Sequence, residues 1–126
     1  MWAVSEAQRV SGLRFYGYGP CGTCRKALAW LKEHSIPVEV IDITTTPPGP
    51  DELRQALLLL GRGRLFNTSG QSYRALGADR VKAMNDDEAL AELAADGRLI
   101  KRPFLVTSDG TILTGFKHQE WAKALA

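Results

Sequence analysis

Two cysteines, Cys21 and Cys24, lie in the segment PCGTCRKA and are the only cysteines in the chain. A Cys-x-x-Cys pair beside a strand–helix–strand pattern is typical of a thiol–disulfide redox site. We expect Cys21 to lie at or just before a helix N-terminus, where free N–H groups and the helix dipole favour an anion. Arg25 and Lys26 add positive charge one turn further on. Cys21 is therefore the candidate nucleophile, because the thiolate is the reactive form of cysteine.

Cys24 is predicted to be the resolving thiol. It lies three residues after Cys21, in the first helical turn, and we expect it to be the less exposed of the two. From that position it can attack a bond formed at Cys21. The helix start, with Gly22, Thr23 and Arg25, is the expected place for an anionic substrate to bind.

Two alternatives to a redox pair remain. A structural zinc site needs four ligands, and the chain has only His34 and His118 to add to the thiols. Because His34 lies ten residues beyond Cys24 near the far end of the same helix, we predict no metal site. The second alternative, a pair of inert thiols, stays open because buried cysteine is a common small hydrophobic residue.

The elements that must position the cysteines form a strand–helix–strand unit. Aromatic and β-branched residues predict strands over 13–19 and 38–43. A helix is expected from about 22 to 34, where apolar residues recur at helical spacing. A connection of this length implies a parallel, right-handed βαβ unit.

The middle of the chain is predicted to be a helical insert over 51–97. Leucines on one face indicate a helix over 51–61, and an Asn85 cap followed by acidic residues indicates another over 85–97. The segment 72–77 predicts at most a short helix.

Strands return after the insert. The segments 104–108 and 111–115 flank an Asp-Gly pair, which is a strong hairpin signal, and a helix is expected over 117–126. The order βαβ, helical insert, ββα predicts an α/β thioredoxin-like fold with a central helical insertion.

The segment KRPF, residues 101–104, supplies a partner for the cysteines. In a thioredoxin-like layout, a proline that opens a strand here faces the cysteine loop, and we expect Pro103 to be cis. Arg102 is then predicted to direct its guanidinium towards Cys21, where its planar fork binds two oxygens of an oxyanion. The alternative is an arginine on a surface loop.

The composition predicts one domain over residues 1–126, with 1–12 as a loosely held arm. The net charge of +2 is too small to imply direct nucleic-acid binding. The longest apolar stretch, 56–60, is too short for a membrane span, and the N-terminus lacks the features of a signal peptide. We therefore expect a monomer in the cytoplasm, where thiols stay reduced.

Four separated motifs, in order, resemble those of the ArsC/Spx family of arsenate reductase-like proteins. They are YxxxxCxxCRKALAWLKEHxIP, LFNTSGxxYRxLG, KRPF and GFKxxEW. The resemblance extends from about Leu13 to Leu125 and is closest to the Cys-x-x-Cys members of the Spx and MgsR kind. It implies a thioredoxin-like domain with a helical insert.

One branch of this family implies arsenate reduction. Its enzymes attack arsenate with one cysteine, complete the reaction with glutathione and glutaredoxin, and hold the oxyanion with three arginines. Cys21 matches the nucleophile and Arg102 matches one arginine. The other two arginines align at or near Asn67 and about Gly115, so weak or absent arsenate reduction is expected. Asn67 stays a candidate substrate-binding residue.

The Spx branch implies a redox-switched transcriptional regulator that binds RNA polymerase through the C-terminal domain of the polymerase α-subunit. Cys24 matches its second thiol. From residues and resemblance together, we predict an oxidoreductase with catalytic Cys21, Cys24 and Arg102. Substrate binding is assigned to Gly22, Thr23, Arg25, Asn67 and Pro103. Thioredoxin, or glutathione with glutaredoxin, is the expected reductant, and no cofactor is expected beyond glutathione as a co-substrate. The regulator is the alternative.

Overall fold

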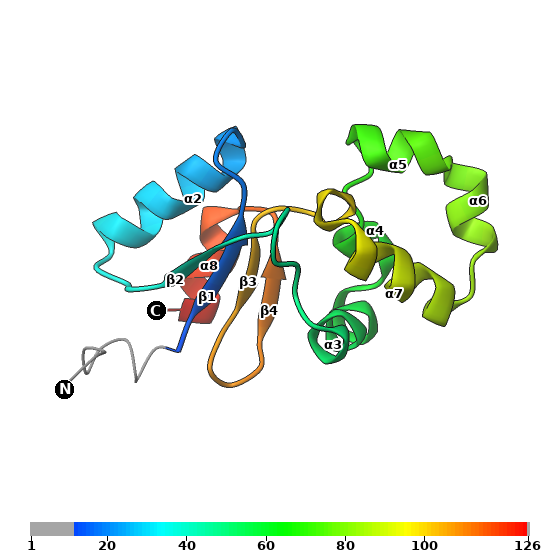
Figure 1. The fold of residues 1–126 in the computed structure, drawn as a ribbon. Helices are drawn as coiled ribbons and strands as arrows, with labels where there is room; N and C mark the ends of the chain where they lie inside the picture. The colour runs from blue at the N-terminus through cyan, green and yellow to red at the C-terminus, as the bar shows by residue number, and fades with distance from the viewer. Residues whose placement is uncertain (1–11, 126) are drawn as a thin grey trace. The chain divides into compact units, whose positions relative to one another are not determined.

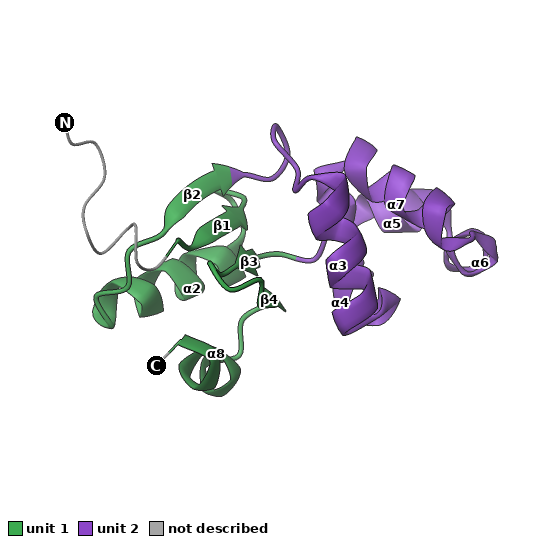
Figure 2. Cartoon of the chain, turned by 90° about the horizontal axis from the view of Figure 1, so that it is seen from below, with its two compact units in different colours: residues 1–41, 102–126 green, residues 42–101 purple. Residues whose placement is uncertain are grey.

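The computed structural model describes residues 12–125. The predicted arm, 1–12, therefore lies outside the described residues except for Gly12. The chain divides into two compact units, residues 1–41 with 102–126 and residues 42–101 (Figure 2). The single-domain organisation stays a prediction.

The first unit is built on a four-stranded sheet. Its strands are β1 (Arg14–Gly17), β2 (Glu39–Asp42), β3 (Phe104–Val106) and β4 (Ile112–Thr114), in the spatial order β2-β1-β3-β4 (Figure 1). The pairs β1–β3 and β3–β4 are antiparallel. This mixed α/β architecture confirms the predicted fold class, although each strand is shorter than expected.

Two helices, α2 (Gly22–Glu33) and α8 (His118–Leu125), contribute to the core of this unit. Phe15, Leu105 and Leu113 are cross-strand partners and therefore lie on one face of the sheet. They join Cys24, Ala27 and Leu31 of α2 and Trp121 of α8 in one buried cluster. The resolving-thiol candidate is thus part of the hydrophobic core.

The turn between β3 and β4 follows the predicted Asp-Gly signal. Gly110 has a φ of 88°, a conformation that glycine adopts without steric cost. The Thr107 N–H donates to the Thr111 carbonyl at 2.9 Å, and the Asp109 carboxylate accepts from the Thr111 N–H at 3.1 Å. The hairpin is therefore closed by local hydrogen bonds.

The second unit is helical. Its elements are α3 (Pro50–Leu60), α4 (Arg62–Leu65), α5 (Gln71–Leu76), α6 (Ala78–Ala83), α7 (Asp86–Ala95) and the 3₁₀ helix η1 (Gly97–Leu99). The sequence predicted α3, α5 and α7 but not α4, α6 or η1. Within the described residues, no helix of either unit is both long and apolar enough to cross a membrane.

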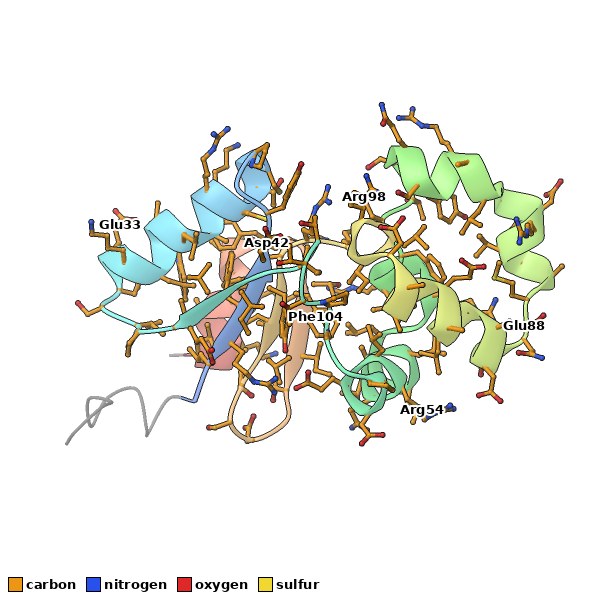
Figure 3. All side chains as sticks on the ribbon, in the orientation of Figure 1. Glu33, Asp42, Arg54, Glu88, Arg98 and Phe104 are labelled. Carbon is orange, nitrogen blue, oxygen red and sulfur yellow. The ribbon has the colours of Figure 1, made fainter. Side chains whose placement is uncertain are left out.

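Side-chain caps and ion pairs order the helical unit. The Asn85 side chain accepts from the Glu88 N–H at 2.8 Å, and the Glu88 carboxylate accepts from the Asn85 N–H at 2.9 Å, which is a complete capping box. Figure 3 shows Glu88 on α7 and Arg54 on α3; the Arg54 guanidinium pairs with Asp87 at 2.9 Å. These contacts confirm the predicted start of α7.

Candidate functional site

Cys21 is the N-cap residue of α2. Its backbone is extended, with φ −77° and ψ 115°, and its Sγ accepts a hydrogen bond from the Cys24 N–H at 3.2 Å. The sulfur thus fills the N-cap role that a side-chain oxygen fills in other helices. The side chain is partly exposed and both thiols are free. The predicted position at the helix start is confirmed.

Cys24 differs sharply from Cys21 in its surroundings. It is 1% exposed and packs within the hydrophobic cluster of the first unit. Burial raises the pKa of the Cys24 thiol to about 12, and its hydrogen bond with Cys21 acts in the same direction. The expected order of exposure is therefore confirmed, and the raised pKa favours the protonated Cys24 thiol at neutral pH.

Tyr18 is a residue of the site that sequence reasoning missed. Its carbonyl accepts from the Cys21 N–H at 3.0 Å, and a backbone hydrogen bond from Tyr18 favours the Cys24 thiolate. The Arg102 guanidinium carbon lies 5.2 Å from the centre of the Tyr18 ring. Tyr18 thus contacts each of the three residues predicted to be catalytic. The feature of the sequence that could have indicated Tyr18 is its position, as an aromatic residue two positions before the Pro-Cys dipeptide.

The peptide bond between Arg102 and Pro103 is cis, as predicted. Pro103 is buried, and its carbonyl accepts from the Gly115 N–H at 3.0 Å, at the ends of β3 and β4. Arg102 is half-buried, and its positive charge favours the thiolate of Cys24. Its cation–π contact with Tyr18, whose carbonyl accepts from the Cys21 N–H, therefore places Arg102 beside the cysteine loop.

The start of α2 is open. A Cβ added at Gly22 would meet nothing within 4 Å, and Thr23 and Arg25 are exposed. The Arg25 N–H donates to the Cys21 carbonyl at 3.1 Å, as in a regular helical turn, and the Arg25 side chain is exposed. Exposed residues therefore follow the partly exposed Cys21 in the first turn of α2, and their role in substrate binding stays a prediction.

Asn67 belongs to the second unit. Its amide donates to the Arg98 carbonyl at 3.4 Å, and its side-chain oxygen accepts from the Ser69 hydroxyl at 3.3 Å. Its backbone N–H donates to the Leu99 carbonyl at 2.7 Å. These contacts order the loop between α4 and α5, and the role of Asn67 in substrate binding stays a prediction.

The described residues hold no group of three or more His, Cys, Asp or Glu side chains arranged to bind a metal ion. What the first unit does bring together is an exposed thiol, a buried thiol one helical turn away, and an arginine. Two adjacent thiols can give up two electrons by forming one disulfide. The arrangement is therefore suited to thiol–disulfide exchange.

A family model described as ArsC matches residues 16–124. The uncharacterised protein YusI of Bacillus subtilis is 44% identical over 113 residues, which cover 86% of this chain and 94% of that protein. The global transcriptional regulator Spx of Enterococcus faecalis is 30% identical over 111 residues, which cover 86% of this chain and 82% of the regulator.

Solved structures agree with these matches. The crystal structure of a possible arsenate reductase from Streptococcus mutans has a TM-score of 0.81 and 40% sequence identity. The match covers 89% of this chain and 98% of that one. This likeness confirms the predicted thioredoxin-like fold.

Proposed function

The chain belongs to the ArsC family, and on that premise we propose that it is a dithiol oxidoreductase in which Cys21 attacks and Cys24 resolves. The observation that carries this proposal is the asymmetry of the pair. The Cys21 sulfur caps α2 and is partly exposed, whereas Cys24 lies buried beneath it in the core. Only one of the two thiols is available to a substrate.

The proposed reaction has two exchange steps. The Cys21 thiolate attacks one sulfur of a substrate disulfide, which forms a mixed disulfide and releases the first thiolate. Cys24 then loses its proton to solvent and attacks the Cys21 sulfur. The second thiolate leaves, and the protein holds a Cys21–Cys24 disulfide after giving up two electrons.

A bound oxyanion such as arsenate is a second substrate class for the same nucleophile. Arg102 and the N-terminus of α2 hold the anion in this proposal, with Gly22, Thr23 and Arg25 at the entrance. Cytoplasmic thioredoxin, or glutathione with glutaredoxin, restores the dithiol, and no other cofactor takes part. The solved relative described as a possible arsenate reductase and another described as an arsenate reductase, from Vibrio cholerae, support this reaction class.

The test is turnover in two coupled assays run side by side. Reduced protein is mixed with a model disulfide, thioredoxin and thioredoxin reductase in one, and with arsenate, glutathione and glutaredoxin in the other. We expect disulfide-dependent oxidation of NADPH that requires both cysteines. Absence of turnover on either substrate, with a dithiol that oxidants leave unchanged, would contradict the proposal.

A transcriptional regulator is the second candidate. It is favoured by the likeness of the chain to Spx of Enterococcus faecalis and to the regulatory protein MgsR of Bacillus subtilis. It is also favoured by two exposed apolar side chains on α3, Leu58 at 77% and Leu59 at 55%. In this case the cysteine pair is a switch, and the partner is RNA polymerase, bound through the C-terminal domain of its α-subunit. A pull-down with that domain, using reduced and oxidised protein, separates a regulator from an enzyme.

A further inference from the structure

Tyr18 joins the cysteine pair to Arg102 through two different parts of its structure. Its backbone holds the cysteine loop, because its carbonyl accepts from the Cys21 N–H at 3.0 Å. Its ring lies against the Arg102 guanidinium at 5.2 Å. A substitution of the side chain therefore changes the contact with Arg102 and leaves the backbone contact with the cysteine loop in place.

The Arg102 guanidinium takes part in none of the ion pairs among the described residues. No carboxylate in the described part of the first unit pairs with it, and Tyr18 and Arg102 are both half-buried. A guanidinium held over an aromatic ring by a cation–π contact, as Arg102 is over Tyr18, spends none of its N–H donors on a hydrogen-bond acceptor, so they remain for two parallel hydrogen bonds to an anion. The contact with the ring also restricts the rotamers of the arginine, so less conformational entropy is lost when an anion binds.

We propose that Tyr18 is a positioning residue for Arg102, and that this pair makes the site prefer disulfides that carry a carboxylate close to the sulfur. The carboxylate accepts from the guanidinium edge while Cys21 attacks the adjacent sulfur. This proposal rests on the disulfide exchange proposed above. It adds the class of substrate and a residue that selects it.

Exchange with a carboxylate-bearing disulfide follows the same two steps. Cys21 and one sulfur of the carboxylate-bearing disulfide form the new bond, and the other half leaves as a thiolate with its carboxylate. Cys24 then displaces the first half and loses its proton to solvent. The disulfide gains two electrons, and Arg102 acts only by holding the anionic group.

The test compares two chromogenic disulfides at neutral pH in stopped flow. Dithiobis(nitrobenzoate) carries a carboxylate on each ring, and dithiodipyridine is neutral. For each variant, the rate constant of attack on dithiobis(nitrobenzoate) is divided by the rate constant of attack on dithiodipyridine. This ratio cancels differences in Cys21 reactivity between variants. The variants are Arg102→Gln, Tyr18→Leu and Tyr18→Phe, with Lys101→Gln as the control because it removes the same charge from the exposed neighbouring residue.

We expect Arg102→Gln to lower the ratio about tenfold, the effect of one charge-assisted hydrogen bond. Tyr18→Leu should lower it several-fold, while Tyr18→Phe, which keeps the ring, and Lys101→Gln should leave it close to the wild-type value. The rate with dithiodipyridine should stay within about twofold of the wild-type value in the control Lys101→Gln, which lies outside the site; for the Arg102 and Tyr18 variants the ratio of the two rate constants is the readout, whatever their rate with dithiodipyridine.

Three results would overturn the inference. They are an unchanged ratio in Arg102→Gln or Tyr18→Leu, an equal loss in Lys101→Gln, and an equal loss in Tyr18→Phe and Tyr18→Leu. A wild-type protein that attacks neither disulfide overturns the proposed function as well. If it attacks both without preference, only the selection by Arg102 fails.

Discussion

At the scale of single residues, the two thiols differ because of where the helix begins. Cys21 precedes the first turn of α2, and its sulfur accepts from the Cys24 N–H. Cys24 lies three residues on, where the helical phase turns its side chain into the core. Two thiols that are one helical turn apart therefore differ in exposure: Cys21 is partly exposed and Cys24 is buried.

The first prediction concerns their reactivity. A limiting amount of an alkylating agent at neutral pH should label Cys21 well before Cys24, because Cys24 is 1% exposed and its pKa is raised. Peptide mapping by mass spectrometry measures the two sites separately. In denaturant the two cysteines should label at similar rates. Equal labelling in the native protein would remove the assigned roles.

The second prediction concerns the pH dependence of stability. The pKa of Cys24 rises from an ordinary value of 9.0 to about 12 on folding, chiefly through burial. Between those values the folded state binds more protons than the unfolded state, so the free energy of unfolding falls as pH rises. The contribution of Cys24 is present in full below pH 9 and is lost by about pH 12.

Denaturant unfolding of the wild type and of Cys24→Ser at several alkaline pH values measures this effect. The variant is less stable at neutral pH, but its stability should fall less steeply. The difference in free energy of unfolding between the wild type and Cys24→Ser should narrow by up to about 1.4 kcal/mol for each pH unit between the two pKa values of Cys24. Parallel curves for the two proteins would show that Cys24 does not titrate in this range.

The positions of individual residues were partly predictable, whereas their roles stay predictions. The spacing of Cys21 and Cys24 and the position of Arg102 before a strand-opening proline predicted that the arginine lies in the same thioredoxin-like layout as the cysteines, and the structure has all three in the first unit. Tyr18 was missed because its contact with Arg102 joins segments far apart in the chain. No periodic or local pattern records such a contact.

At the scale of elements, close packing at one glycine organises the helical unit. A Cβ on Gly97, at the start of η1, would overlap the Ile43 carbonyl oxygen. Gly97 thus permits η1 to lie directly against the chain that leaves β2. The sequence indicated Gly97 only as a helix stop, because its packing partner lies outside the local pattern.

The third prediction follows from this contact. Gly97→Ala should lower the free energy of unfolding by about 1–3 kcal/mol or more, the usual range for overpacking. Gly63→Ala is the matched control, since a Cβ at Gly63 would meet nothing within 4 Å. It should be neutral or slightly stabilising, because alanine favours helix. Equal losses in both variants would refute the packing argument.

Elements with a long pattern were predicted better than short ones. The helix periodicity and the Asn85 cap identified α2, α3 and α7, and the Asp-Gly pair identified the hairpin. The helices α4 and α6 have four and six residues, too few to show an amphipathic repeat. They depend on tertiary contacts instead: Arg62 donates to the Val81 and Met84 carbonyls at 2.9 and 2.8 Å.

At the scale of the whole molecule, the distribution of arginine side chains bears on whether the chain can hold arsenate. Arg102 lies in the unit that holds the cysteines. Arg62, a cation that could in principle replace a missing arginine, is bound within the second unit to Asp86 at 2.8 Å and to two carbonyls. The resemblance to arsenate reductases aligns their other two arginines with Asn67 and about Gly115. We therefore expect this chain to have fewer cationic groups with which to hold arsenate.

The fourth prediction is that arsenate turnover is weak or absent. Each lost donor to a developing oxyanion removes about 3 kcal/mol of transition-state stabilisation, so two losses slow the reaction by several powers of ten. The assay uses arsenate, glutathione and glutaredoxin, with a dedicated arsenate reductase measured beside it. Turnover comparable to that enzyme would show that other side chains replace the missing arginines.

The most direct test of the central claim is intact-mass spectrometry after exposure to oxidised glutathione. Cys24→Ser should accumulate one glutathione on Cys21, because the resolving thiol is absent. Wild-type protein should instead lose two hydrogens and carry no adduct, and Cys21→Ser should remain unmodified. An adduct on Cys24 in Cys21→Ser, or wild-type protein that keeps its adduct, would contradict the assignment of Cys21 as nucleophile and Cys24 as resolving thiol.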